Sequence, residues 1–353
     1  MTTSHSEGQR IMKHLNRNVG LITSMSQGFV NTYLLYAACQ LDLFDRIKHG
    51  CTTSEMLAGE AGIEKTVAQK LLRPLTACGM LKEDDGRYLL TEAGDLLTED
   101  ADHSLKGYVL YCGGICAKSW SVMAEAARRK ETPYAFAMGS ELFTDNGEDS
   151  GHYNAFDTMM NFVSSNMELS GFLEQIGSPE KCRIVDIGGG TGAVLSQFLR
   201  YFPNADGEIL DLGFVREKAM DTLERNGLEH RSSFRETDFF KSFEVRGDLF
   251  LLSRVLHDWQ DEDAVKIIRN IRSNMDETSV LYVIELLIPE ETEWKNMGVY
   301  MNDLQIWAVC GGTERKLSEY SCLFEKAGLF CTGQQKLPSG ETVMEVRTAG
   351  RKI

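Results

Sequence analysis

The chain has 353 residues, a length that predicts about two domains and enough chain to bury full-sized cores. Thirty-seven Lys and Arg against 52 Asp and Glu give a net charge of −15, which argues against a duplex nucleic-acid partner, because such binding depends on cationic side chains. No uncharged apolar run approaches the roughly 20 residues that a membrane helix needs, and the first ten residues have no signal-peptide character. We therefore expect a cytoplasmic protein without a membrane partner.

The nine cysteines are scattered, and the nearest pair is Cys112 and Cys116. No second cysteine pair or histidine cluster stands near them in the sequence to complete a zinc site. We therefore expect buried thiols in a reducing compartment and no metal.

The first hundred residues predict helices followed by a hairpin. Residues 29–41 are apolar nearly all round, so this helix should be buried against another helix or another subunit. Helices over residues 54–61 and 64–77 follow, and residues 80–90 predict two short strands around an Asp-Gly turn. This order is typical of a winged helix. Because residues 51–100 carry five Lys and Arg against ten Asp and Glu, we expect an architectural wing and no contact with DNA.

Residues 101–180 have an interrupted helical pattern, within which residues 156–163 are rich in methionine and phenylalanine. Such side chains suit an adaptable apolar pocket, and Met159 and Phe162 are candidates to line one. Packing in the core is the alternative for both.

Strands and helices alternate in the remainder of the chain. The predicted strands cover residues 183–187, 207–210, 233–237, 248–253 and 280–287, with helices over residues 193–200, 216–224 and 262–273 between them. A helix over residues 318–327 and strands near 329–335 and 342–347 finish the chain. This alternation predicts a doubly wound α/β fold, whose mostly parallel sheet binds ligands beyond the carboxyl ends of its strands.

The first two strand ends carry residues that suit a nucleoside with a positive charge. The first strand runs into the turn DIGGGTG over residues 186–192, whose glycines allow a close approach to a ligand but do not match the dinucleotide pattern. Asp186, just before the turn, would repel a pyrophosphate and suits a cationic ligand. Asp211 follows the second strand, 23 residues beyond Gly188, where a carboxylate accepts both hydroxyls of a ribose.

The next three strand ends add polar and aromatic groups. Asp238 and Phe239 follow the third strand, where they place a hydrogen-bond acceptor and an aromatic face near an adenine. The segment SRVLHDW, residues 253–259, follows the fourth strand, and Glu285 lies near the end of the fifth. All five ends therefore contribute to one binding edge of the sheet.

On these residues the sequence resembles the class I S-adenosylmethionine-dependent small-molecule O-methyltransferases of the caffeate, hydroxyneurosporene and antibiotic-tailoring type. The resemblance covers nearly the whole chain. The motifs that carry it are VDIGGGTG (185–192), DL (211–212), TDFF (237–240), LHDW (256–259) and GGTER (311–315).

The resemblance implies a Rossmann-like methyltransferase sheet, mostly parallel with an antiparallel last strand, preceded by an N-terminal helical dimerisation and winged-helix domain. We expect the dimerisation and winged-helix domain over residues 1–105 and the S-adenosylmethionine-binding domain over residues 176–353. Between them, residues 106–175 should form a helical linker that contributes to the substrate pocket.

The cofactor implied is S-adenosylmethionine, without a metal. The family places Gly188 at the methionine part of the cofactor, Asp211 at its ribose, and Asp238 with Phe239 at its adenine. The full set of predicted cofactor-binding residues is Asp186, Gly188, Gly190, Asp211, Asp238, Phe239, Ser253 and Arg254. Plant members commonly have lysine where Ser253 stands.

The resemblance also implies that His257 is a general base flanked by Glu285 and Glu314. Full proton transfer from a phenol to histidine is uphill by about 3.5 pKa units, so the proton should leave as the methyl group arrives. The acceptor pocket in this family involves the segment between the two glutamates, although its side chains could instead pack in the core. The predicted acceptor-pocket residues are Met159, Phe162, Met301, Asn302, Gln305 and Trp307.

We therefore predict methyl transfer to a hydroxyl, phenolic in type, of an aromatic secondary metabolite by a homodimer joined through its N-terminal helices. One competing hypothesis is a relative that uses the cofactor's positive charge for decarboxylation or pericyclic chemistry. A second is an N- or C-methyltransferase, and a third is a winged-helix regulator that keeps the methyltransferase-like body as a ligand sensor.

Overall fold

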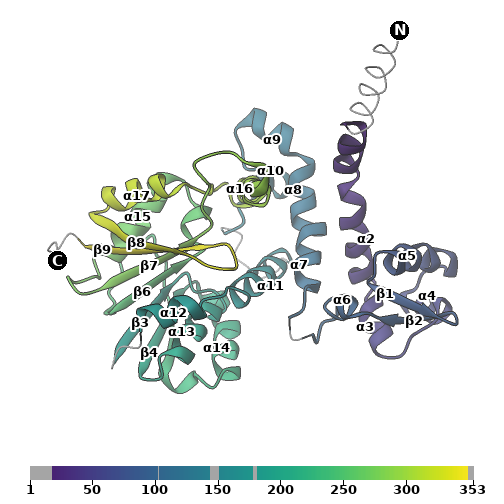
Figure 1. The fold of residues 1–353 in the computed structure, drawn as a ribbon, viewed down its shortest axis with the longest axis horizontal. Helices are drawn as coiled ribbons and strands as arrows, with labels where there is room; N and C mark the ends of the chain where they lie inside the picture. The colour runs from purple at the N-terminus through teal and green to yellow at the C-terminus, as the bar shows by residue number, and fades with distance from the viewer. Residues whose placement is uncertain (1–17, 102, 144–150, 178–180, 349–353) are drawn as a thin grey trace, which may run out of the picture. The chain divides into compact units, whose positions relative to one another are not determined.

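A computed structural model describes residues 18–101, 103–143, 151–177 and 181–348, without the side chains of residues 151–155 and 157. The chain divides into two compact units between Gly114 and Ile115 (Figure 1). The predicted boundary at residue 105 comes before this point, and most of the segment 106–175 falls in the second unit.

The first unit contains the elements of the winged-helix prediction in the expected order. They are α2 (Gly28–Gln40), α3 (Leu43–Lys48), α4 (Ser54–Ala61), α5 (Lys65–Ala77), the antiparallel pair β1 (Leu81–Asp84) and β2 (Arg87–Leu90), α6 (Glu92–Asp95) and α7 (Lys106–Tyr111). A π-helical segment, Cys112–Cys116, spans the division between the units.

The apolar helix predicted over residues 29–41 is α2, and only its C-terminal end is buried. Ala38 and Cys39 pack with α3 in the core of the first unit. Nearer the N-terminus, Phe29, Val30 and Tyr33 keep 62%, 50% and 47% of their surface exposed. One part of α2 therefore presents large apolar side chains that the described residues of this chain leave exposed.

The second unit begins with five helices and continues as an alternating α/β fold. Its helices are α8 (Ala117–Ser121), α9 (Met123–Arg129), α10 (Pro133–Met138), α11 (Gly151–Ser165), α12 (Ser170–Ile176), α13 (Ala193–Tyr201), α14 (Arg216–Arg225), α15 (Asp261–Arg272), α16 (Met297–Cys310) and α17 (Leu317–Lys326). Its strands are β3 (Cys182–Ile187), β4 (Ala205–Asp211), β5 (Ser232–Glu236), β6 (Leu249–Ser253), β7 (Val280–Glu285), β8 (Leu329–Lys336) and β9 (Thr342–Thr348). Sequence reasoning anticipated every one of these strands but not α16.

The seven strands form one sheet in the order β5-β4-β3-β6-β7-β9-β8. The five strands from β3 to β7 pair in parallel, and β9 is antiparallel to both of its neighbours. The predicted fold class, a mostly parallel sheet with an antiparallel last strand, is confirmed.

Helices cover both faces of this sheet, so its central strands are mostly buried. Figure 1 shows α15 and α17 on one face and α12, α13 and α14 on the other, and each group packs on its own cluster of buried side chains. All six residues of β7 are buried. The strand order reverses between β3 and β6, the point at which open α/β sheets form a ligand crevice beyond their carboxyl ends.

Candidate active site

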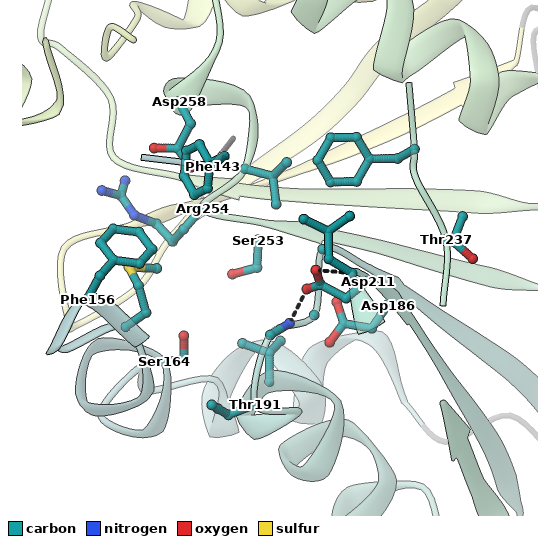
Figure 2. A pocket seen from close by; sticks show the side chains of 18 of the residues that line it. Phe143, Phe156, Ser164, Asp186, Thr191, Asp211, Thr237, Ser253, Arg254 and Asp258 are labelled. Carbon is teal, nitrogen blue, oxygen red and sulfur yellow. Dashed lines mark hydrogen bonds between the residues drawn. The ribbon is translucent and has the colours of Figure 1, made fainter. Parts of the chain in front are cut away.

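A cavity of about 410 Å³ opens at this switch point, beside the ends of β3, β4 and β6 (Figure 2). All eight predicted cofactor-binding residues line it. They come from segments that are far apart in the sequence, and the parallel strands bring them to one edge.

The turn after β3 forms one wall of the cavity, and its glycines are required by its backbone. Gly188 and Gly190 have φ angles of 66° and 52°, in the left-handed region that favours glycine. A Cβ atom on Gly188 would also lie 2.8 Å from Cγ2 of Val255. The turn can therefore bring bare backbone against a ligand.

Asp211, the last residue of β4, is held at the rim by two backbone amides. Its Oδ2 accepts a hydrogen bond from the amide of Gly190 at 2.8 Å, and its Oδ1 accepts one from Leu212 at 2.6 Å (Figure 2). These bonds fix the carboxylate in the place where the sequence predicts contact with a ribose.

Asp186 and Ser253 bring buried polar atoms without partners to the same cavity. Asp186 is only 1% exposed, and neither its carboxylate oxygens nor Oγ of Ser253 has a hydrogen-bond partner among the described residues. Burial, together with the charge of Asp211, raises the pKa of Asp186 to about 7. Buried polar groups are nearly always paired in native proteins, so these atoms point to a polar or cationic ligand.

Aromatic side chains form another part of the lining. The ring of Trp259 lies 4.6 Å from Phe240 and 6.2 Å from Phe239, in both cases edge to face, and 5.5 Å from Phe143. Phe143 in turn lies 5.8 Å from Phe156. This wall offers apolar, π-rich surface to a planar ligand.

Helix α11 contributes one face to the cavity, and this face includes residues adjacent to the two that the sequence predicted. The lining residues are Phe156, Met160, Asn161 and Ser164, whereas the predicted Met159 and Phe162 are not among them. Residues 156, 160 and 164 are spaced by four, the spacing of one helix face, and this regularity could have selected them.

The three predicted catalytic residues lie together in a buried cluster beside the cavity. Nδ1 of His257 is 3.1 Å from Oε1 of Glu314 and 3.4 Å from Oε2 of Glu285. Nε2 of His257 is 3.3 Å from Oδ1 of Asp258. Asp258 and Arg254 line the cavity, whereas His257 is not among the lining residues.

Arg254 supplies a positive charge to this cluster. Its Nη2 lies 2.9 Å from Oε1 of Glu314, and its Nη1 lies 3.4 Å from Oε2 of Glu285. The ligating atoms of His257 and the two glutamates lie within 4.8 Å of one another, a spacing that would also suit a metal ion. The guanidinium neutralises one of these two negative charges and a proton on His257 can neutralise the other, so the cluster does not need a metal for charge balance.

The ionisation of the cluster follows from burial opposed by these charges. Burial alone would raise the pKa of Glu314, but Arg254 and His257 lower it to about 2. For Glu285, burial prevails and its pKa is raised, although its Oε1 accepts hydrogen bonds from the amides of Val255 and Leu256. Burial and Arg254 lower the pKa of His257, and the surrounding carboxylates outweigh them and raise it.

The segment GGTER holds the loop that carries His257. The amide of Thr313 donates to the carbonyl of His257 at 2.7 Å, and the guanidinium of Arg315 donates to the carbonyls of Leu256 and Trp259. A Cβ atom on Gly312 would lie 1.9 Å from the carbonyl oxygen of His257. Glycine is therefore needed at residue 312 for the two segments to meet.

Comparison with known proteins identifies the family. Residues 120–330 match an O-methyltransferase domain, and residues 23–100 match an O-methyltransferase dimerisation domain. The chain belongs to the O-methyltransferase family. It is 30% identical to O-methyltransferase SfmM3 of Streptomyces lavendulae, over 89% of this chain and 96% of the relative.

Solved structures of similar proteins agree with this assignment. LaPhzM superposes with a TM-score of 0.86 at 25% identity, over 94% of this chain and 99% of its own. The O-methyltransferase NcsB1 from neocarzinostatin biosynthesis, solved with S-adenosylmethionine and 2-hydroxy-5-methyl naphthoic acid, superposes with a TM-score of 0.76 at 27% identity, over 90% of this chain and 96% of its own.

In this O-methyltransferase, the acceptor-pocket residues predicted between the glutamates lie on α16, away from the cavity lining. Nδ2 of Asn302 donates to Oε1 of Glu314 at 2.7 Å, so this side chain belongs to the histidine cluster. Gln305 accepts a hydrogen bond from the indole of Trp120. Met301 is 47% exposed and Trp307 is half-buried.

None of the helices in the described part of the chain has the length and apolarity to cross a bilayer.

Proposed function

We propose that this O-methyltransferase transfers the methyl group of S-adenosylmethionine to a phenolic hydroxyl of an aromatic small molecule, with His257 as the general base. One observation carries the proposal: a buried histidine with a carboxylate on Nδ1 lies beside a cavity that contains an unpaired buried carboxylate. The naphthoic acid bound to NcsB1 supports an aromatic acceptor.

The cavity fits S-adenosylmethionine, which when bound supplies a methyl group on a positively charged sulfur. The unpaired carboxylate of Asp186 favours a cation, and Oγ of Ser253 offers it a further polar contact. Asp211, fixed by two amides, would accept the ribose hydroxyls, and Asp238 with Phe239 would contact the adenine. Trp259 extends the aromatic wall on that side.

The acceptor ring would lie against Phe156, on the side of the cavity where Figure 2 shows Arg254 and Asp258. Glu314 accepts hydrogen from Nδ1 of His257, which leaves Nε2 unprotonated and basic. Nε2 would take the phenolic proton as the new bond forms, and Glu314 then stabilises the imidazolium. General-base assistance of this kind is worth about 10²–10⁴ in rate.

A methyl-labelled donor offered with a panel of phenols and hydroxynaphthoates tests this function. We expect S-adenosylhomocysteine and methylated product to form in equal amounts. A product that forms without S-adenosylhomocysteine would instead support the decarboxylase or pericyclase hypothesis.

His257→Asn tests the base. The variant should bind S-adenosylmethionine with wild-type affinity by calorimetry, while its turnover falls by about 10²–10⁴. Wild-type turnover in this variant would rule out His257 as the base.

We also propose that two copies of the chain associate through α2. The exposed apolar side chains of Phe29, Val30 and Tyr33 and the match to a dimerisation domain support this assembly. The double variant Phe29→Ser, Tyr33→Ser should be monomeric by light scattering. Leu89→Ser, which changes an exposed leucine on the β1–β2 hairpin, is the control and should stay dimeric.

A further inference from the structure

Arg254 occupies an unusual place in the cluster behind His257. Its backbone has a φ angle of 56°, in the left-handed region, which residues with a side chain seldom adopt away from turns and helix ends. It follows β6 directly, and its amide donates to the carbonyl of Ile284 in β7. In Figure 2 the guanidinium extends away from Asp186 and Asp211, and its ion pairs are with the two glutamates.

The charge balance explains why a cation is needed there. Glu285 and Glu314 both approach Nδ1 of His257, and both are fully buried. Two buried carboxylates so close together cannot both stay ionised without a neighbouring cation, so without one the cluster would take up a proton, most readily at His257, its strongest base. Among the described residues, two cationic side chains pair with these glutamates, His257 when protonated and Arg254.

We propose that Arg254 is a positioning residue, whose guanidinium holds Glu285 and Glu314 together as an ionised pair behind His257 and keeps the imidazole neutral until the acceptor is deprotonated. This inference rests on the proposed function, because only a neutral His257 can act as the general base that the proposed function requires. With Arg254 present, the two ionised glutamates leave one uncompensated negative charge, and the proton that His257 takes from the acceptor neutralises it.

The other groups packed around the cluster do not replace the guanidinium. Arg315 donates to the carbonyls of Leu256 and Trp259 and forms its ion pair with Asp261. In the part of the chain that the structure describes, the remaining ionisable side chains that face the cluster are Asp258, Asp303, Cys310 and Tyr320. None of these four is a cation, so loss of Arg254 should draw an additional proton into the cluster.

The direct test is the titration of His257 by NMR, with the histidine rings labelled and the His257 signal identified by its loss in His257→Asn. In Arg254→Gln the apparent pKa of His257 should rise by roughly 1–3 units, the usual effect of removing one neighbouring charge. Arg254→Lys should shift it less, because lysine keeps the charge but cannot bridge both carboxylates.

Arg231→Gln is the matched control for loss of an arginine. Arg231 donates to the carbonyls of Leu199, Phe202 and Ala205, and its loss should leave the titration of His257 unchanged. If Arg254→Gln does not fold, the comparison of wild type with Arg254→Lys carries the test. A folded Arg254 variant in which His257 titrates as in wild type would overturn the inference.

Cofactor affinity separates this positioning role from direct contact with the cofactor. S-adenosylhomocysteine should bind Arg254→Gln nearly as well as wild type by calorimetry, and a loss of roughly tenfold or more would overturn the positioning role. The titration needs no acceptor, so a shifted pKa in a protein that never methylates would refute the proposed function alone. Methyl transfer with an unshifted pKa would refute this inference alone.

Discussion

Replacement of Asp186 by asparagine should make the cofactor-free protein more stable above pH 7. In the folded protein burial raises the pKa of this carboxyl from 3.8 to about 7, so the folded state holds a proton that the unfolded chain has released. Stability therefore falls as the pH rises from about 4 to about 7, by about 1.4 kcal/mol for each unit. The full penalty is about 4 kcal/mol, and asparagine removes the group that causes it.

The assay is chemical denaturation of both proteins at several pH values, without cofactor. The stability advantage of Asp186→Asn over wild type should grow by about 3 kcal/mol between pH 5 and pH 8. Asp206→Asn, at an exposed aspartate in β4, controls for the loss of a carboxylate from the same sheet and should show no such growth.

Binding of the cofactor should respond in the opposite sense. At pH 8 Asp186→Asn should bind S-adenosylmethionine more weakly than wild type, because the variant lacks the carboxylate that favours a cation. In wild type near pH 6, binding should release a proton, seen as a binding enthalpy that depends on the buffer. A stability difference that is the same at pH 5 and pH 8, or equal affinity of the two proteins at pH 8, would refute the reasoning.

Three further predictions follow from the histidine cluster and the loop that supports it. Glu314→Gln should lower turnover by roughly 10² or more with little change in cofactor affinity, because glutamine cannot stabilise the imidazolium of His257; equal turnover would contradict this. Since the pKa of His257 is raised, initial rates measured from pH 5.5 to 9 should increase with pH through the range above 6.5, and a flat profile would argue against the base. Gly312→Ala should destabilise the fold by about 1–3 kcal/mol in chemical denaturation. Gly298→Ala, in α16, is the control for Gly312→Ala: apart from its chain neighbours and the backbone of its own helix, no atom lies within 4 Å of the added carbon, so this change should instead stabilise the fold by about 0.5–1 kcal/mol.

The parallel sheet could be predicted because burial on both faces makes its strands short apolar runs between helices. The strand β7 is the clearest case, with six buried residues in a row. Helices α2 and α16 both lack a polar face that would reveal a helical period. The unbroken apolar run over residues 33–39 still indicated α2, whereas Asn302, Asp303 and Gln305 interrupt the run in α16. The sequence therefore predicted the elements that have either a periodic pattern or a long apolar run, and α16 has neither.

The cavity could be predicted because its residues follow strand ends, and a parallel sheet brings strand ends together. The partners of Arg254 could not, because β7 and the loop after α16 supply them and only the folded chain shows the contact. Sequence order placed Arg254 beside Ser253 and suggested a cofactor contact, whereas its guanidinium pairs with Glu285 and Glu314. Phe143 and Phe156 lie outside the recognised motifs, and only the folded chain brings Phe143 against Trp259 and Phe156 against Phe143.

The cavity and the base cluster are completed at different points along the chain. Among the residues that the structure describes, those that line the cavity run from Phe143 to Trp259, whereas the cluster also requires Glu285 and Glu314. Sequence changes beyond residue 259 that leave the sheet intact can thus alter turnover and spare cofactor affinity. Relatives that keep the first segment and change the second would retain a cofactor site free to serve other chemistry.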